Sequence, residues 1–286
     1  MKMIIKAPAK LNLGLDAPLV HPNKEVEWEM IMTSISLCDY VTLETNDSQE
    51  IEIDTDSGFL PADSRNLALK AAELFFKANH INSGLKITIE KNIPVAAGLG
   101  GGSSDAAAVL RGLNQMFETG YSIFELAKFG LQIDSDVPYC VYGKTALVSG
   151  YGEIITPLPK LPSMWFVLAK PNVSVSTPKI IRSLYGTELQ HPNISLLTEA
   201  VKRQDYGEIA GNLANTLENV TGELYPQILT IKQRLVNYGA DGSLMTGSGP
   251  TTYGICRKKV GLIECLIVFL AFVGKYIWPD QSKLNN

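Results

Sequence analysis

The residues best suited to chemistry in this 286-residue sequence form a glycine-rich run, Pro94–Ser104. Within this run, four of the five residues at positions 98–102 are glycine. Such a run gives up backbone entropy, and it is useful where the main chain must approach a ligand closely or adopt positive φ angles. A helix-favouring run, Asp105–Met116, follows, so free amides and the positive end of a helix dipole converge at one place. The pattern predicts a phosphate site, to which Ser103 and Ser104 add hydroxyls for oxygens or a metal ion.

A simpler interpretation of the glycine run is a flexible loop followed by an Asp or Ser helix cap. The run lacks the lysine of a P-loop and does not match GxGxxG, so it belongs to neither common class of phosphate loop. It does lie between a predicted strand, Leu85–Glu90, and a predicted helix, as a nucleotide-binding loop must. This position favours the phosphate site.

Two carboxylates two residues apart form a second candidate, in the segment Asp134-Ser135-Asp136-Val137-Pro138. A carboxylate within hydrogen-bond reach can accept the proton of a hydroxyl nucleophile. If the segment is extended, both carboxylates lie on one face. The same residues fit a turn closed by Asx hydrogen bonds equally well.

Two further motifs have both a chemical and a structural interpretation. Gly247-Ser248-Gly249 would bring more backbone amides toward a ligand, or it forms a tight hairpin. Lys10 follows Pro8 in a predicted turn after a short strand, where an ammonium could stabilise a phosphate or pair with a carboxylate. A lone lysine is more often a solvated surface residue.

The composition excludes several classes of protein. Hydrophobic residues make up 45% and charged residues 19%, as in a globular chain, and the net charge of −4 disfavours broad nucleic-acid binding. The four cysteines form no CxxC pair and have no nearby histidine, which argues against zinc and disulfides and favours the cytoplasm. No signal-peptide pattern stands at the N-terminus. The apolar run Leu262–Val273 is too short to span a membrane, so we expect a buried helix or strand there.

The periodicity of apolar residues predicts a mixed α+β fold. The expected strands are Met3–Ile5, the antiparallel pair Val41–Glu44 and Ile51–Ile53, then Leu85–Glu90 and Trp165–Ala169. The expected helices are Asn66–Phe76, Asp105–Met116, a helix around Leu213–Thr216, and Gln227–Tyr238. Prolines at 157, 159 and 162 mark a break. We therefore expect two domains, residues 1–160 and 161–286.

Three motifs together resemble those of the GHMP kinases. The glycine run from Pro94 to Ser104 resembles their nucleotide loop, and Pro8–Leu13 and Gly247–Thr251 resemble their first and third motifs in the same order and separation. The resemblance covers about residues 1–256. It implies an N-terminal domain like domain 2 of ribosomal protein S5, a ferredoxin-like C-terminal domain, and an ATP site in the cleft between them.

The resemblance also implies roles for individual residues. Lys10 and Asp136 would be catalytic, with Asp136 as the base and Lys10 stabilising the transferring phosphate. ATP would be bound by Asn66, Pro94, Val95, Ala96, Ala97, Gly98, Leu99, Gly100, Gly101, Gly102, Ser103 and Ser104, and the substrate by Asn12, Thr177, Gly247, Ser248 and Gly249. Mg²⁺ is implied by the chemistry, without an identifiable ligand set. The expected partner is a small molecule rather than a nucleic acid or membrane, and the expected state is a monomer or homodimer.

Within the family, the chain most resembles the kinases that phosphorylate a cytidylylated methylerythritol in the non-mevalonate route to isoprenoids. The resemblance lies in Lys10, Asn12, Met30–Thr33, Asn66-Leu67 and Asp134–Cys140. Those kinases hold the cytosine with a Tyr and a His, where this chain has Glu25 and Val26. Where a second aromatic residue is usual in those kinases, this chain has Ile180 and Ile181, and Tyr185, one helical turn later, could substitute for it. These changes predict a weakened grip on the base. Two alternatives follow: a GHMP kinase for a different alcohol, or a catalytically weak nucleotide-binding paralogue.

Overall fold

The computed structural model describes residues 1–23, 25–56, 60–185 and 188–257. The predicted apolar segment Leu262–Val273 lies outside these described residues. In chain order the elements are β1 (Lys2–Val20), β2 (Val26–Asn46), β3 (Ile51–Thr55), α1 (Leu67–Asn79), β4 (Gly84–Glu90), α2 (Gly101–Met116), α3 (Ile123–Leu131), α4 (Val137–Tyr142), β5 (Ala146–Gly150), β6 (Ile154–Pro157), β7 (Trp165–Ala169), α5 (Thr177–Leu184), α6 (Ile194–Lys202), α7 (Tyr206–Gly211), β8 (Ala214–Asn215), α8 (Leu217–Leu224), α9 (Gln227–Asn237), β9 (Gly242–Met245) and β10 (Thr252–Cys256).

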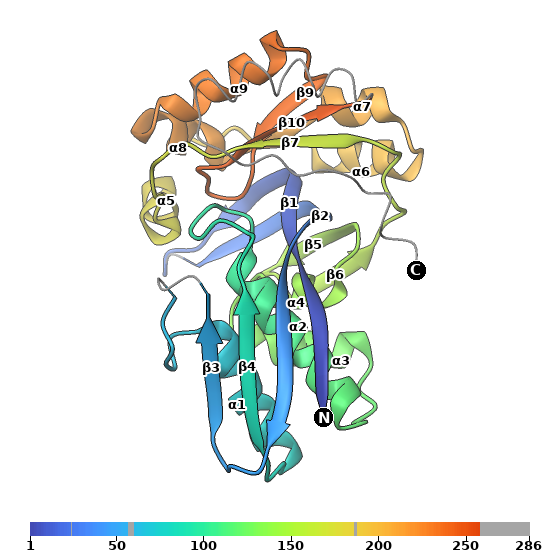
Figure 1. The fold of residues 1–286 in the computed structure, drawn as a ribbon. Coiled ribbons are helices and arrows are strands. Elements are labelled where there is room, and N and C mark those ends of the chain that lie inside the picture. The colour runs from blue at the N-terminus through green and yellow to red at the C-terminus, as the bar shows by residue number, and fades with distance from the viewer. Residues whose placement is uncertain (24, 57–59, 186–187, 258–286) are drawn as a thin grey trace.

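Two long antiparallel strands, β1 and β2, run through the molecule (Figure 1). They are the centre of a sheet with the order β3-β4-β2-β1-β8, and β5 and β6 extend it from β2. In β1 every residue from Ala9 to Ala17 is buried, and because successive side chains of a strand point to opposite faces, both faces of β1 are covered there. We predicted a short strand and a turn here. The turn is wrong, because Pro8 stands at a bulge of a continuous strand, where its missing N–H is tolerated.

Helices α1, α2 and α4 lie behind the lower part of this sheet in Figure 1. Helix α2 contacts β1 and β2 and also packs on α1, α3 and α4, so its alanine-rich sequence is buried on nearly all sides. Helix α1 begins where Asn66 accepts a hydrogen bond from the Ala68 amide. Because α1 connects β3 to β4, the two strands are parallel. The expected antiparallel pairing of Ile51–Ile53 is therefore wrong.

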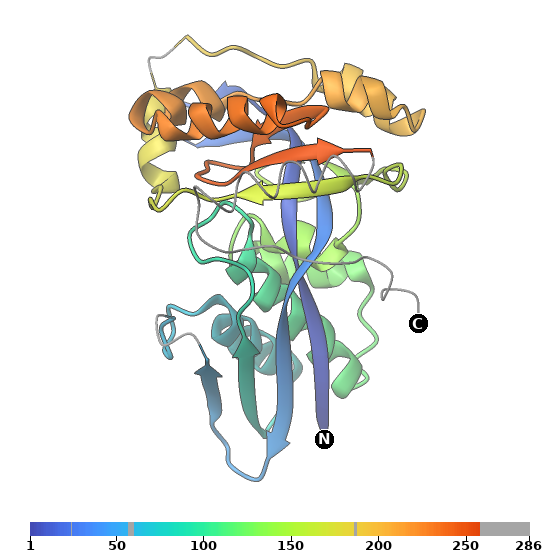
Figure 2. The same ribbon diagram turned by 45° about the horizontal axis from the view of Figure 1, so that its top comes forward.

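A second sheet of three antiparallel strands, in the order β7-β10-β9, covers the upper end of β1 and β2 (Figure 2). Helix α9 packs on β9 and β10 through Ile231 and Leu235. The predicted strand Trp165–Ala169 and the predicted helix Gln227–Tyr238 are both confirmed. The predicted helix around Leu213–Thr216 is wrong, since Ala214 and Asn215 pair with β1 as strand β8.

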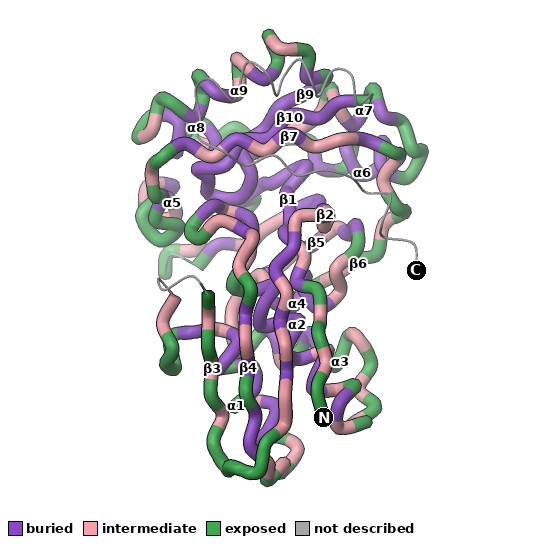
Figure 3. The backbone as a smooth tube through the Cα atoms, viewed as in Figure 1, coloured by how far each residue is buried: buried purple, intermediate pink, exposed green. Residues whose placement is uncertain are grey.

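The buried side chains join the two sheets into one interior. A cluster of buried residues combines Leu11 and Leu13 of β1 with Leu197 of α6 and with Leu244 and Tyr253 of the second sheet. Figure 3 shows this continuous buried region where β1 and β2 pass beneath β7, β9 and β10. The expected division at residue 160 falls between β6 and β7, where the chain leaves the first sheet, and it stays a prediction.

Candidate active site

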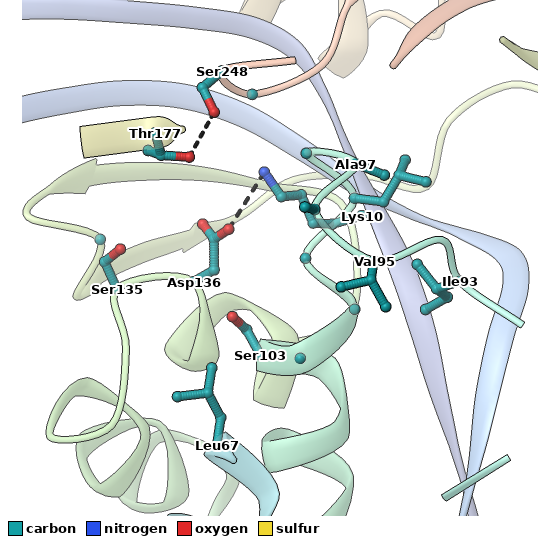
Figure 4. Close-up of a pocket in the computed structure, with 18 of the residues that line it drawn as sticks. Lys10, Leu67, Ile93, Val95, Ala97, Ser103, Ser135, Asp136, Thr177 and Ser248 are labelled. Carbon is teal, nitrogen blue, oxygen red and sulfur yellow. Dashed lines mark hydrogen bonds and ion pairs between the residues drawn. The ribbon is translucent and has the colours of Figure 1, made fainter. Parts of the chain in front are cut away.

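A pocket of about 380 Å³ lies where the glycine run meets the β9–β10 hairpin and the end of α5, within the size range of small-molecule sites. Its wall includes residues 93–103, Lys10 from β1, Ser135 and Asp136 before α4, Thr177 and Ile181 of α5, and Gly247 and Ser248 of the hairpin. The structure therefore brings together the three motifs that the sequence placed far apart. Figure 4 shows Lys10 and Asp136 pointing toward each other in this pocket.

The glycine run needs glycine at two positions for different reasons. Gly98 has a φ of +75°, and a Cβ there would lie 2.6 Å from the Thr246 carbonyl oxygen of the hairpin. Gly100, the residue before α2, has a φ of +66°, and its Cβ would lie 2.8 Å from Cγ of Lys10. Helix α2 begins at Gly101, inside the run rather than after it. The first amides of α2 have no partner within the helix, so they are available to an anion.

A buried ionic cluster of Asp39, Lys91 and Asp105 supports the glycine run from beneath. Asp39 accepts the backbone amides of Asn92 and Ile93, at 2.6 and 2.7 Å. Lys91 pairs with Asp39 and with Asp105, whose Oδ2 lies 2.7 Å from the Lys91 ammonium. Sequence reasoning missed this cluster. The available signal was an aspartate, Asp39, inside a strand and a lysine, Lys91, directly after one.

The protonation of this cluster follows from its burial. Burial, reinforced by the Asp39 carboxylate and opposed by Lys91, raises the pKa of Asp105 to about 8. Burial disfavours the charged form of Lys91, but the two carboxylates outweigh it and raise the Lys91 pKa above its usual value. Burial therefore favours the protonated form of Asp105, which limits the negative charge under the loop.

Lys10 is held in place from two sides. Its Nζ lies 3.4 Å from Oδ2 of Asp136 and 3.0 Å from Oδ1 of Asn12. The Lys10 side chain is 6% exposed and that of Asp136 is 31% exposed. Lys10 is thus not the solvated surface residue that a lone lysine usually is. Asn12 is fully buried beneath it, and its amide nitrogen approaches the sulfur of Met30.

The two carboxylates of the Asp134–Asp136 segment have separate partners. Asp134 Oδ1 accepts the backbone amide of Asp136 at 3.1 Å, which is the Asx hydrogen bond of the local interpretation. Asp136 directly precedes α4 without capping it through its side chain, and its carboxylate faces Lys10. Of the two interpretations of this segment, the structure therefore has the turn and not the extended strand.

The hairpin motif satisfies both of its interpretations, because Gly247 and Ser248 form the β9–β10 turn and also line the pocket. Ser248 Oγ lies 2.7 Å from the hydroxyl of Thr177 at the start of α5 (Figure 4). Asn215 donates to the carbonyl oxygens of Met245 and Gly247 at 2.8 and 2.9 Å, which fixes the turn. Sequence reasoning missed Asn215, since it expected a helix there.

Four residues expected at the site do not line the pocket, and each has another role. Asn66 caps α1, and the Ser104 hydroxyl donates to the Pro8 carbonyl at 2.7 Å, which leaves Ser103 as the serine of the glycine run that lines the pocket. Asn12 lies behind Lys10. Gly249 belongs to the hairpin turn, with a φ of +86°, and an added Cβ there would lie 2.7 Å from the sulfur of Met245.

The pocket wall also holds two aromatic side chains that the sequence did not single out together. Trp28 of β2 and Tyr151, just after β5, both line it, with Leu15, Met30 and Leu217. Glu25 and Val26 are not part of the wall, and Val26 is buried as the partner of Val20 between β1 and β2. Tyr185 also lies outside the wall and is 56% exposed, which disfavours it as a substitute for the second aromatic residue.

Comparison with known proteins identifies the family to which the chain belongs. Residues 66–144 match the family described as GHMP kinases N terminal domain, and residues 197–263 match GHMP kinases C terminal. The chain belongs to the GHMP kinases, and its mixed α+β fold is the fold of that family. No helix among the described residues is long and apolar enough to cross a membrane.

The chain is also similar to individual proteins of known name. The chain is 55% identical over 260 residues to the 4-diphosphocytidyl-2-C-methyl-D-erythritol kinase of Lactiplantibacillus plantarum, covering 91% of this chain and 90% of that one. It is also 55% identical to the enzyme of the same name from Levilactobacillus brevis, covering 91% and 92%. The crystal structure of a 4-(cytidine 5'-diphospho)-2C-methyl-D-erythritol kinase superposes with a TM-score of 0.79 at 29% identity, covering 95% of this chain and 96% of that one.

Proposed function

We propose that this chain is an ATP-dependent kinase that phosphorylates a hydroxyl of 4-diphosphocytidyl-2-C-methyl-D-erythritol, in the non-mevalonate route to isoprenoids. The observation that carries the proposal is the Lys10–Asp136 pair facing the glycine loop in one pocket, at 3.4 Å between Nζ and Oδ2. The relatives named above, at 55% identity over nine-tenths of the chain, support the choice of substrate.

The ATP phosphates would lie against the amides of Gly101, Gly102 and Ser103, where α2 begins. Three features fit a phosphate chain: free helix-terminal donors, glycines that keep side chains out of the way, and the nearby ammonium of Lys10. Apolar wall residues beside the loop, among them Leu67 and Val95, suit the adenine. Asn66 would act indirectly, by fixing the start of α1 and so the position of Leu67.

In the transfer step Asp136 accepts the proton of the substrate hydroxyl as its oxygen bonds to the γ-phosphorus. The bond between that phosphorus and the β–γ bridging oxygen breaks, and ADP leaves with the bridging oxygen. Lys10 lies beside Asp136 and stabilises the negative charge on the transferring group. Because the Lys10 side chain is almost fully buried, little water screens this interaction.

Mg²⁺ would accompany the nucleotide, where it neutralises phosphate charge. The protein oxygen that fits it best is the Ser103 hydroxyl, which is in the pocket wall beside the first amides of α2. Among the described residues there is no group of three or more His, Cys, Asp or Glu side chains that would hold a metal by themselves. A single protein hydroxyl, that of Ser103, suits Mg²⁺, which usually keeps several waters and binds through substrate phosphates.

The cytosine would be held by the two aromatic side chains of the pocket wall. Trp28 and Tyr151 offer two ring faces, and base–aromatic stacking contributes about 1–3 kcal/mol per base. In the similar kinases a Tyr at the position of Glu25 helps to hold the cytosine, and the two rings would take that role in this chain. Thr177 and Ser248 stand beside the reacting end and would contact the substrate between its base and its hydroxyl.

The proposal is tested by measuring ADP release from ATP with the purified full chain and a panel of small alcohols. The panel contains the cytidylylated methylerythritol, mevalonate and homoserine. We expect turnover with the first compound only. Turnover with another alcohol would replace the substrate assignment, and ATP binding without turnover of any alcohol would indicate a nucleotide-binding paralogue.

The remaining expectations belong to the same proposal. A small-molecule kinase of this kind would work in the cytoplasm, in agreement with the buried thiols of Cys38 and Cys140, which are in no disulfide. The two-domain division at residue 160, the absence of nucleic-acid binding and the monomeric or homodimeric state stay predictions.

A further inference from the structure

One carboxylate oxygen connects the glycine loop to the segment that carries Asp136. Asp134 Oδ1 accepts a hydrogen bond from the Ser103 hydroxyl at 2.9 Å and another from the backbone amide of Asp136 at 3.1 Å. Ser103 is in the first turn of α2, beside the amides at the loop, and Asp136 is the proposed base. The same atom therefore contacts both halves of the phosphoryl-transfer site.

The main chain of Asp134 is fixed as well. Its amide donates to the Gly130 carbonyl at 3.2 Å, and its own carbonyl accepts the Val137 amide at the start of α4, also at 3.2 Å. The side chain thus projects from a turn that is tied to α3 on one side and to α4 on the other. A rigid support of this kind transmits the position of the loop helix to the neighbouring Asp136.

The position of Asp136 matters because its carboxylate meets Lys10 at 3.4 Å, on the edge of a good ion-pair distance. If the Asp136 backbone rotated, the carboxylate would move relative to both Lys10 and the loop amides. Hydrogen-bond and in-line geometry in a transfer reaction tolerate only small displacements, and an error of about 1 Å can cost about 10²-fold in rate.

We infer that Asp134 is a positioning residue for the transfer reaction: its Oδ1 holds the proposed base, Asp136, in register with the glycine loop through Ser103. The inference rests on the proposed kinase function. Asp134 contributes here as a hydrogen-bond acceptor, and its negative charge is not required. It is therefore distinct from a metal ligand and from an alternative base, both of which would need the carboxylate.

This distinction decides the choice of variants. Asp134→Asn keeps an Oδ1 acceptor in the same place and removes the charge, whereas Asp134→Ala removes the acceptor. Ser103→Ala removes one of the two donors, and it is combined with Asp134→Ala in a double-mutant cycle. Asp205→Ala is the matched control, because Asp205 also accepts a backbone amide, that of Glu208 at 3.1 Å, but is exposed and outside the pocket wall.

We expect Asp134→Ala to lower kcat about 10- to 100-fold, with a much smaller change in the Kd for ATP. Asp134→Asn should stay within about threefold of the parent in kcat and in the Mg²⁺ concentration for half-maximal rate. The double variant should be no slower than the slower of the two single variants, because both changes break one linkage. The control Asp205→Ala should keep the parent kcat even if it unfolds more easily.

Two results would overturn the inference. If Asp134→Asn loses as much activity as Asp134→Ala, the charge is essential and Asp134 is a metal ligand or a base. If Asp134→Ala keeps the parent kcat, the residue has no positioning role. The proposed function is checked separately by turnover of the parent protein. Coupling between Ser103 and Asp134 is also measured in urea unfolding, which needs no substrate.

Discussion

Replacing Gly100 by alanine tests whether the glycine loop positions Lys10 as well as the nucleotide. Gly100 is in the left-handed region, with a φ of +66°, and an added Cβ would lie 2.8 Å from Cγ and 3.2 Å from Cε of Lys10. Carbon atoms pack best at about 3.5–4.0 Å, so the Lys10 side chain would have to move by about 1 Å. Its ammonium is held by Asn12 and Asp136, so such a shift would disturb both contacts.

Two separate costs are expected. The left-handed backbone should lower the free energy of unfolding by about 1–2 kcal/mol when a Cβ is present. The displacement of Lys10 should reduce kcat by about 10- to 100-fold, because a misplacement of this size weakens stabilisation of the transferring phosphate. ATP binding should weaken less than kcat, since the first amides of α2 come after the substituted residue.

Gly120 provides the matched control. It has a similar φ of +74°, but a Cβ there would meet no atom within 4 Å, and Gly120 is outside the pocket wall. Gly120→Ala should therefore show the same loss of stability with the kcat of the parent. The assay is ADP release with saturating cytidylylated methylerythritol, together with urea unfolding of all three proteins. Equal kcat values for the Gly100 and Gly120 variants would refute the argument.

Three other changes give independent checks. Asp136→Asn should keep the ATP affinity measured by calorimetry but lower kcat by about 10²–10⁴-fold, and a loss of only a few fold would make Asp136 structural. Asp105→Asn should flatten the pH dependence of stability. The parent Asp105 has a folded-state pKa of about 8 against 3.8 when unfolded, so the free energy of unfolding that it contributes is complete below about pH 4 and declines as the pH rises to 8. Identical pH profiles from urea titrations of parent and variant would contradict this assignment. Trp28→Ala should raise the KM for the cytidylylated substrate about tenfold or more with little change in the KM for ATP, whereas Tyr185→Ala should change neither. An unaffected KM in the Trp28 variant would show that the base binds elsewhere.

Local patterns were sufficient for several elements. The strand Trp165–Ala169 and the helix Gln227–Asn237 follow from apolar periodicity within one segment, and both formed as predicted. The glycine run also has a local cause, because its backbone angles require residues without a Cβ at Gly98 and Gly100. Predictions failed where pairing with distant residues overrode local preference, as in β8, where Ala214 and Asn215 pair with Gly14 and Leu15 of β1.

The sequence by itself determined which residue types stand at the site and in what order, because glycine backbone freedom and the spacing of motifs are properties of short segments. It did not determine which residues touch. Lys10 meets Asp136 only because α4 packs against β1, and Trp28 joins Tyr151 in the pocket wall only because β2 pairs with β5. Asp39, Lys91 and Asp105 become a buried cluster in the same way. Register and burial depend on the whole packed interior, so these contacts were decided by the tertiary structure alone.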